Sequence, residues 1–141
     1  MKQLFLVAIM LLTFGMAKAQ CTVYSTDKLG STPTKKGKTD ANFVYSTDKN
    51  GGTAVKVGKI DGNILYSVDR KGLNPTKKGK IEDGIIYSSD RFGTNLVKVG
   101  KIENNIIYFT DSYGANPTII GKVVGDDCGG AGALLLLLIR K

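Results

Sequence analysis

Short apolar runs and polar turns alternate along most of the chain, and the pattern recurs every 21 residues. In the second copy, residues 44–47 and 53–60 are rich in β-branched and aromatic side chains and predict two strands. Residues 48–51 form a turn between them, and Asp61-Gly62 is a dipeptide typical of type I′ hairpins. No window shows the i, i+3, i+4, i+7 spacing of a helix. The repeating unit is therefore predicted to be a β-hairpin.

Five series of identical residues keep this period without insertion, which marks a repeat architecture. The series are Tyr24, Tyr45, Tyr66, Tyr87 and Tyr108; Asp27, Asp48, Asp69, Asp90 and Asp111; Gly30, Gly51, Gly72, Gly93 and Gly114; Gly37, Gly58, Gly79, Gly100 and Gly121; and Lys38, Lys59, Lys80, Lys101 and Lys122. They divide the repeat region, 20–127, into five copies. These copies are 23–43, 44–64, 65–85, 86–106 and 107–127.

The predicted fold class is all-β: a shallow, roughly five-fold symmetric antiparallel barrel or flower of about ten short strands. A propeller blade needs about 40 residues, twice this period. A parallel β-solenoid remains the alternative, although a hairpin turn in every copy favours antiparallel strands. Closure also removes the exposed edges of an open sheet. The C-terminal apolar tail is expected to plug the centre.

A β-bulge is expected at Gly100-Lys101. Strict alternation from Val97 and Val99 would direct Ile102 to the opposite face of the strand. One additional residue at Gly100-Lys101 would return Ile102 to the apolar side.

Residues 1–19 have the pattern of a secretory signal peptide. Lys2 precedes an apolar run, and Ala17-Lys18-Ala19 fits the cleavage pattern. The chain is therefore predicted to be exported to the periplasm, the cell envelope or the medium, and the mature protein to begin at Gln20. Lipidation of Cys21 is the alternative, but lipid attachment generally requires a small residue where Gln20 stands.

Two cysteines, Cys21 and Cys128, flank the repeats. In an exported protein an even number of cysteines suggests a disulfide, which would lock the first repeat to the last; two free thiols are the alternative. The tail, 128–141, is interpreted as a glycine-rich linker followed by an apolar run. The expected plug is formed by Leu134, Leu135, Leu136, Leu137, Leu138 and Ile139. The run is too short to span a bilayer, but a membrane-contact or sorting role remains open beside the plug.

The chain has 20 basic and 12 acidic residues, a net charge of +8. Without Lys2 and Lys18 the mature chain has 18 basic residues and a net charge of +6. This charge favours an anionic partner such as a membrane surface or a polysaccharide, and export makes nucleic acid unsuitable. The lysine series from Lys38 to Lys122 is a candidate cationic rim. The same lysines also fit a solvated surface without a ligand.

Candidate chemistry is sparse in this chain. There is no histidine, and no catalytic set, phosphate loop, metal cluster or cofactor motif is found. The aspartate series is interpreted as capping its own turns rather than binding calcium. The tyrosine series suits packing, with stacking on sugars as the alternative. A non-enzymatic binding scaffold is the leading hypothesis, and a peripheral membrane protein using the tail and the basic rim is the alternative.

The repeat motif resembles that of the β-flower proteins, which are small exported bacterial proteins. The resemblance rests on Ile86-Tyr87-Ser88-Ser89-Asp90, on Gly100-Lys101-Ile102 and on the short homopolymeric tail Leu134 to Leu138. It implies a shallow symmetric barrel with hairpin petals and with the tail at its centre. This architecture is similar to the Tubby C-terminal barrel, which encloses a hydrophobic helix and binds phosphoinositide membranes. The resemblance implies no activity for this chain.

Overall fold

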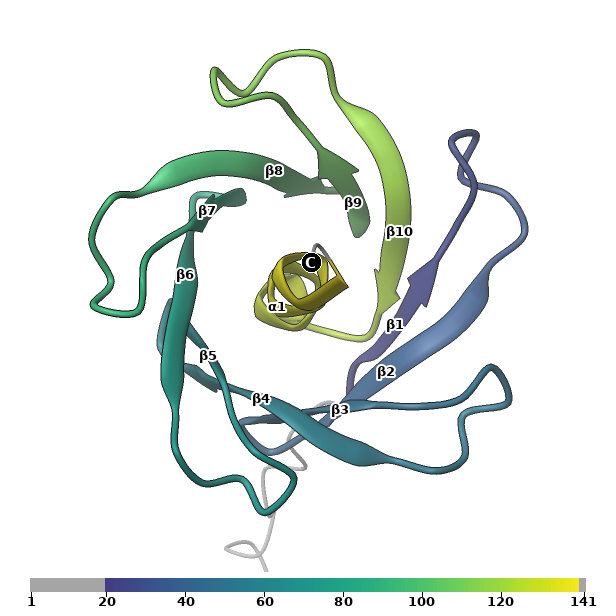
Figure 1. The fold of residues 1–141 in the computed structure, drawn as a ribbon. Helices are drawn as coiled ribbons and strands as arrows, with labels where there is room; N and C mark the ends of the chain where they lie inside the picture. Colours follow the sequence, from purple (N-terminus) through teal and green to yellow (C-terminus); the bar gives the residue numbers. More distant parts are fainter. Residues whose placement is uncertain (1–19, 140–141) are drawn as a thin grey trace, which may run out of the picture.

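The computed structural model describes residues 20–139, which form one closed barrel of ten antiparallel strands around a C-terminal helix (Figure 1). The predicted signal peptide, 1–19, lies outside the described residues. The strands are β1 (Thr22–Ser25), β2 (Thr34–Asp40), β3 (Phe43–Ser46), β4 (Val55–Asp61), β5 (Ile64–Ser67), β6 (Thr76–Glu82), β7 (Ile85–Ser88), β8 (Val97–Glu103), β9 (Ile106–Phe109) and β10 (Thr118–Val124). The helix α1 spans Gly129–Ile139. Each strand pairs with its neighbours in sequence, and β1 pairs with β10 to close the barrel.

Consecutive antiparallel pairing gives the barrel two different ends. Long loops follow the odd-numbered strands and extend outward around the barrel (Figure 1). Two-residue turns follow β2, β4, β6 and β8 at the opposite end. We call these the loop end and the hairpin end. One side chain from each short strand is buried in the core: Val23, Val44, Leu65, Ile86 and Ile107.

The expected bulge is present, one residue earlier than predicted. Tyr87 pairs with Lys98 and Ile86 pairs with Gly100, so the additional residue is Val99. The corresponding residues in the other long strands are Lys36, Val57, Lys78 and Ile120. The bulge lets Val99 and Gly100 both be buried, and Ile102 then packs against the core as expected.

The turn predicted at Asp61-Gly62 is also displaced by one residue. Asp61 is the last residue of β4 and pairs with Ile64, so Gly62 and Asn63 are the central turn residues. Of these two, Gly62 alone has a positive φ, of 58°. A type I′ turn requires a positive φ at both positions. That pattern occurs instead at Asp83-Gly84 and at Asn104-Asn105.

The apolar tail forms α1 inside the ring of strands (Figure 1). Leu134 is fully buried, Leu135 and Leu136 are nearly so, and Leu137 and Leu138 pack against the core. A helix enclosed on every side must be apolar all round, which explains why a homopolymeric run suits this position. The segment interpreted as a glycine-rich linker belongs to the helix, because α1 begins at Gly129. The side chain of Ile139 lies outside the described part.

Close packing between strands and helix accounts for one of the two glycine series. A Cβ added to Gly58 would lie 2.9 Å from the Tyr66 carbonyl oxygen and 3.0 Å from Leu134 Cγ. A Cβ on Gly79 would clash with the Tyr87 carbonyl and lie 3.0 Å from Leu137 Cδ1. A Cβ on Gly100 would clash with the Tyr108 carbonyl and lie 3.1 Å from Leu136 Cδ1, whereas a Cβ on Gly37 would clash with the Tyr45 carbonyl and make only ordinary contact with Leu135. These glycines therefore let the neighbouring strand and the helix approach the wall.

The two cysteines form a disulfide, as one of the two sequence interpretations expected. Cys21 and Cys128 are bonded, with their Cα atoms 5.6 Å apart and a sequence separation of 107. Cys21 immediately precedes β1, and Cys128 immediately precedes α1. The bridge therefore ties the first strand to the point at which the chain enters the barrel. A disulfide is consistent with an oxidising, exported location.

Candidate binding surface at the loop end

Each long loop is organised by the aspartate at its start. In the first loop, Asp27 Oδ1 accepts hydrogen bonds from the backbone N–H groups of Leu29 (3.0 Å) and Ser31 (2.8 Å). The other four aspartates accept the equivalent pair of bonds. The capping role predicted for this series is therefore what the structure shows. Among residues 20–139, no group of three or more potential metal ligands is found.

The hydrogen bonds also favour the charged form of these carboxylates. A hydrogen bond from the Thr32 hydroxyl, together with the bond from the Ser31 backbone, lowers the pKa of Asp27. The Leu73 backbone bond lowers the pKa of Asp69, and the Ala115 backbone bond lowers that of Asp111. Hydrogen bonds from Thr94 lower the pKa of Asp90. Each of these four loops thus contains an ionised aspartate whose carboxylate already accepts hydrogen bonds from the backbone of the same loop.

The residue five positions after each aspartate has a positive φ, although none of the five is glycine. Asn74, Asn95 and Asn116 have φ of 52° and donate their side-chain amides to Asp69, Asp90 and Asp111. Thr32 and Thr53 have φ of 49° and 42°. Asparagine tolerates this conformation far better than a β-branched residue does.

We therefore expect Thr53→Asn to stabilise the protein by about 1 kcal/mol. The substitution relieves backbone strain. It also supplies a hydrogen bond from the side-chain amide to the Asp48 carboxylate, which the described structure lacks at Thr53. Urea denaturation measures the change. The reciprocal control, Asn95→Thr, is expected to lower the unfolding free energy by a similar amount. A neutral or destabilising Thr53→Asn would contradict this account of the loops.

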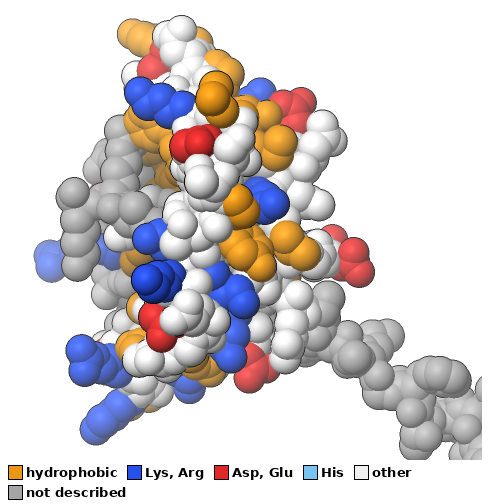
Figure 2. Space-filling model, turned by 90° about the vertical axis from the view of Figure 1, so that its right-hand side faces the viewer, with side chains coloured by type: hydrophobic (Ala, Val, Ile, Leu, Met, Phe, Trp, Pro, Cys, Tyr) orange, Lys and Arg blue, Asp and Glu red, His pale blue; other side chains and the backbone are white. Residues whose placement is uncertain are grey.

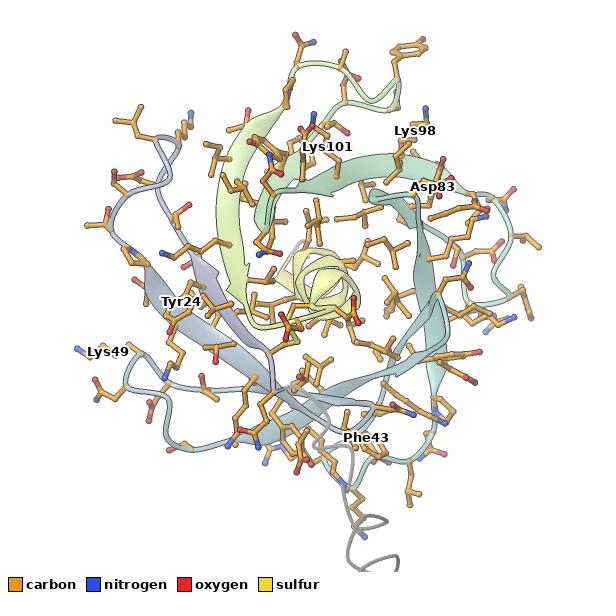
Figure 3. The ribbon with its side chains drawn as sticks, turned by 180° about the vertical axis from the view of Figure 1, so that it is seen from behind. Tyr24, Phe43, Lys49, Asp83, Lys98 and Lys101 are labelled. Atoms are coloured by element: carbon orange, nitrogen blue, oxygen red, sulfur yellow. A yellow bond between two sulfur atoms is a disulfide. The ribbon has the colours of Figure 1, made fainter. Side chains whose placement is uncertain are left out.

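A second lysine series, not singled out from the sequence, supports the loops. The side chain of Lys35 lies against Gly51, with its Cδ 2.7 Å from the position that a Cβ on Gly51 would occupy. Lys56, Lys77 and Lys98 lie against Gly72, Gly93 and Gly114 in the same manner. Each of these lysines therefore packs its stem on the loop of the next copy, and Lys98 points away from the barrel (Figure 3). Their 21-residue spacing could have identified this series from the sequence, although Ile119 replaces the lysine in the last copy.

The lysines proposed as a cationic rim lie in the barrel wall, within the half of each long strand nearer the hairpin end. Lys80 pairs with Glu82 at 2.7 Å, and this hydrogen bond raises the pKa of Lys80. Lys101 pairs with Glu103 at 3.0 Å. Lys80, Lys101 and Lys122 also lie over tyrosine rings of the adjacent short strands, at 5.2–5.8 Å. Two of the five charges are thus compensated locally.

Charge is divided unequally between the two ends. The loop end, taken as 26–36, 47–57, 68–78, 89–99 and 110–120, has eleven Lys or Arg and five Asp, a net charge of +6. The hairpin end, taken as 37–42, 58–63, 79–84, 100–105 and 121–127, has five Lys and seven Asp or Glu, a net charge of −2. The basic character of the protein therefore belongs to the loop end. Lys49 extends outward at a loop tip there (Figure 3).

Large apolar side chains are exposed at the same end. Six of the seven exposed large hydrophobic residues among those described lie in the long loops or at the first residue of β8. The most exposed are Tyr113 (90%), Leu29 (85%) and Phe92 (68%). Figure 2 shows hydrophobic side chains mostly over the upper part of the visible face and Lys and Arg mostly over its lower part.

The described part of the tail contributes little to this surface. Leu138 lines a shallow depression of about 330 Å³ together with Val57 and Lys78, where α1 reaches the loop end. The remaining leucines face the barrel interior. Within residues 20–139, α1 falls short of the length that a membrane-spanning helix needs.

Comparisons with known proteins identify no relative of this chain. No protein-family model matches it, and neither a curated protein nor a solved structure shows significant similarity.

Proposed function

We propose that this protein is an exported, non-enzymatic scaffold that binds an anionic surface through the loop end of its barrel. The observation that carries the proposal is the separation of charge, +6 at the loop end against −2 at the hairpin end. Such a separation orients a protein on a negatively charged surface as well as attracting it. The ligand class is an anionic membrane surface or an anionic polysaccharide.

A near five-fold arrangement of hairpins and membership of the β-flower proteins form part of this proposal. The five register shifts at corresponding positions support the symmetric arrangement. The disulfide supports export. The alternative role, lipid contact through the tail, is less well supported because Leu134, Leu135 and Leu136 are buried inside the barrel.

Two triple variants that remove the same charge from opposite ends test the proposal. Lys49→Ser/Arg70→Ser/Lys71→Ser changes the loop end, and Lys38→Ser/Lys59→Ser/Lys122→Ser changes the hairpin end. The probes are dextran sulfate and vesicles with about 30% anionic phospholipid. Because each lysine or arginine near an anionic membrane contributes about 1 kcal/mol, the loop-end variant should bind roughly tenfold to a hundredfold more weakly. The hairpin-end variant should bind within about threefold of the unchanged protein.

Equal losses in the two variants would show that net charge alone drives binding, and the loop end would lose its assignment. Failure of the unchanged protein to bind either probe at physiological salt would overturn the proposed function itself.

A further inference from the structure

The loop tips differ between copies at positions where the structure imposes no requirement. The residues two positions after each aspartate are Leu29, Asn50, Lys71, Phe92 and Tyr113. Their backbone N–H groups hold the loop together, but the three apolar side chains among them are 68–90% exposed. Positions that are identical in every copy build the scaffold. Variation at an exposed position of otherwise equivalent loops therefore indicates where one side of the barrel is specialised.

Barrel closure makes the three loops with apolar tips consecutive around the ring. Around the ring, the strand order β2-β1-β10-β9-β8-β7 places loops 26–33, 110–117 and 89–96 next to one another. These loops carry Leu29, Tyr113 and Phe92. We call them the apolar sector. The remaining adjacent loops, 47–54 and 68–75, carry Lys49, Arg70 and Lys71 at their tips. In Figure 1 the apolar sector extends from the upper right over the top to the left side of the ring, and the basic loops lie at the lower right and lower left.

Two of the three loops in the apolar sector also carry a basic residue beside the apolar one. Lys28 precedes Leu29 in sequence, and the Arg91 guanidinium lies 4.8 Å from the centre of the Phe92 ring. Leu96 and Val97 add further exposed apolar surface to the loop that carries Phe92. Apolar and aromatic side chains next to Lys or Arg suit the membrane interface, where the apolar part enters the acyl boundary and the cation stays among anionic headgroups.

We propose that the apolar sector inserts Leu29, Phe92 and Tyr113 into the interfacial region of an anionic phospholipid bilayer. This inference rests on the proposed function and selects lipid as the anionic ligand. A hydrated polysaccharide has no apolar interior to receive a leucine side chain that is 85% exposed at a loop tip. A bilayer accepts the leucine, the two aromatic rings and the neighbouring cations at the same time.

The chain contains no tryptophan, so one introduced tryptophan reports on a single site. Tyr113→Trp places the probe in the apolar sector. Asn50→Trp, at the equivalent position of a basic loop, is the matched control. With vesicles of phosphatidylcholine and phosphatidylglycerol, the fluorescence of the Tyr113→Trp variant should shift to shorter wavelength and be quenched by lipids brominated on their acyl chains. The Asn50→Trp variant should show neither effect. Equal responses from the two variants would overturn the assignment of the sector.

Affinity provides an independent test in the full chain. Leu29→Ser/Phe92→Ser/Tyr113→Ser should lower partitioning into these vesicles at least tenfold while leaving binding to dextran sulfate unchanged. The control, Leu73→Ser/Val124→Ser, removes exposed apolar side chains outside the sector and should stay within about twofold of the unchanged protein. Retained melting temperatures establish that both variants are folded. Unchanged vesicle binding by the triple variant would refute insertion while leaving the proposed function intact. If the triple variant lost binding to both vesicles and dextran sulfate, the tips would be a polyanion site rather than a lipid site.

Discussion

Replacing Gly79 with alanine is expected to destabilise the protein by about 3 kcal/mol or more, a large part of the stability of a domain of this size. The added methyl group would meet the Tyr87 carbonyl on the neighbouring strand and Leu137 on α1 at once. Backbone confined in a closed barrel cannot move aside without breaking its ladder of hydrogen bonds. Urea and thermal denaturation, followed by circular dichroism, measure the loss.

Gly52→Ala is the matched control for Gly79→Ala. A Cβ at Gly52 would approach only the end of the Asp48 side chain, 3.2 Å away, and that side chain lies on an exposed loop. Its expected cost is within about 0.5 kcal/mol. The double variant Gly79→Ala/Leu137→Ala removes the clash with the helix but keeps the clash with the strand, so its cost should be smaller than the sum of the costs of the two single variants. A Gly79→Ala protein with the melting temperature of the unchanged chain would contradict the close-packing role of this glycine series.

Strand composition and turn residues were sufficient to predict the ten antiparallel strands. The bulge and the hairpin turn were each misplaced by one residue. The local pattern around Val97 and Ile102 requires one additional residue but does not distinguish Val99 from Gly100. The reason for the choice is three-dimensional: Gly100 must face the Tyr108 carbonyl and Leu136, so the additional residue falls before it.

The first turn of the helix could not be predicted from propensity, because glycine disfavours helix and three of the first four residues of α1 are glycine. Tertiary packing overrides that preference. A Cβ on Gly130 would lie 3.2 Å from Ile60, and one on Gly132 would lie 3.0 Å from Ile102 and Val123. The entrance to the barrel therefore leaves little room for side chains at these positions, and glycine fits there without displacing the neighbouring side chains.

The candidate surface was only partly visible in the sequence. The sequence was sufficient to predict the basic charge and the aspartate turns. The 21-residue period, however, selected Lys38 and its equivalents as the candidate rim, and these lysines lie in the barrel wall. The apolar sector depends on ring closure, because Leu29 stands 84 positions before Tyr113 in the chain. Pairing of β1 with β10 makes their two loops neighbours. Such adjacency cannot be derived from the order of the repeats without assuming closure.

Loss of the Cys21–Cys128 disulfide is expected to cost about 4 to 5 kcal/mol, because the bridge closes a loop of more than 100 residues in the unfolded chain. For a domain of about 120 residues this corresponds to a fall in melting temperature of roughly 15 to 20 °C. The location of the bridge adds to its effect. Cys21 precedes a strand of only four residues that closes the barrel, and Cys128 precedes the helix that fills it. Closure and filling therefore depend on the same covalent link.

The measurement compares the oxidised protein with the reduced protein and with Cys21→Ser/Cys128→Ser. Reduction and double substitution should lower the melting temperature by similar amounts, since both release the same loop. Reductant should have no effect on the double variant, which controls for nonspecific action of the thiol reagent. A fall below about 3 °C would mean that the burial of α1 and the β1–β10 pairing hold the barrel closed without the bridge. Because Cys21 Sγ and Cys128 Sγ both lie near the Asp126 carbonyl in a buried corner of the hairpin end, slow reduction of the folded protein is also expected.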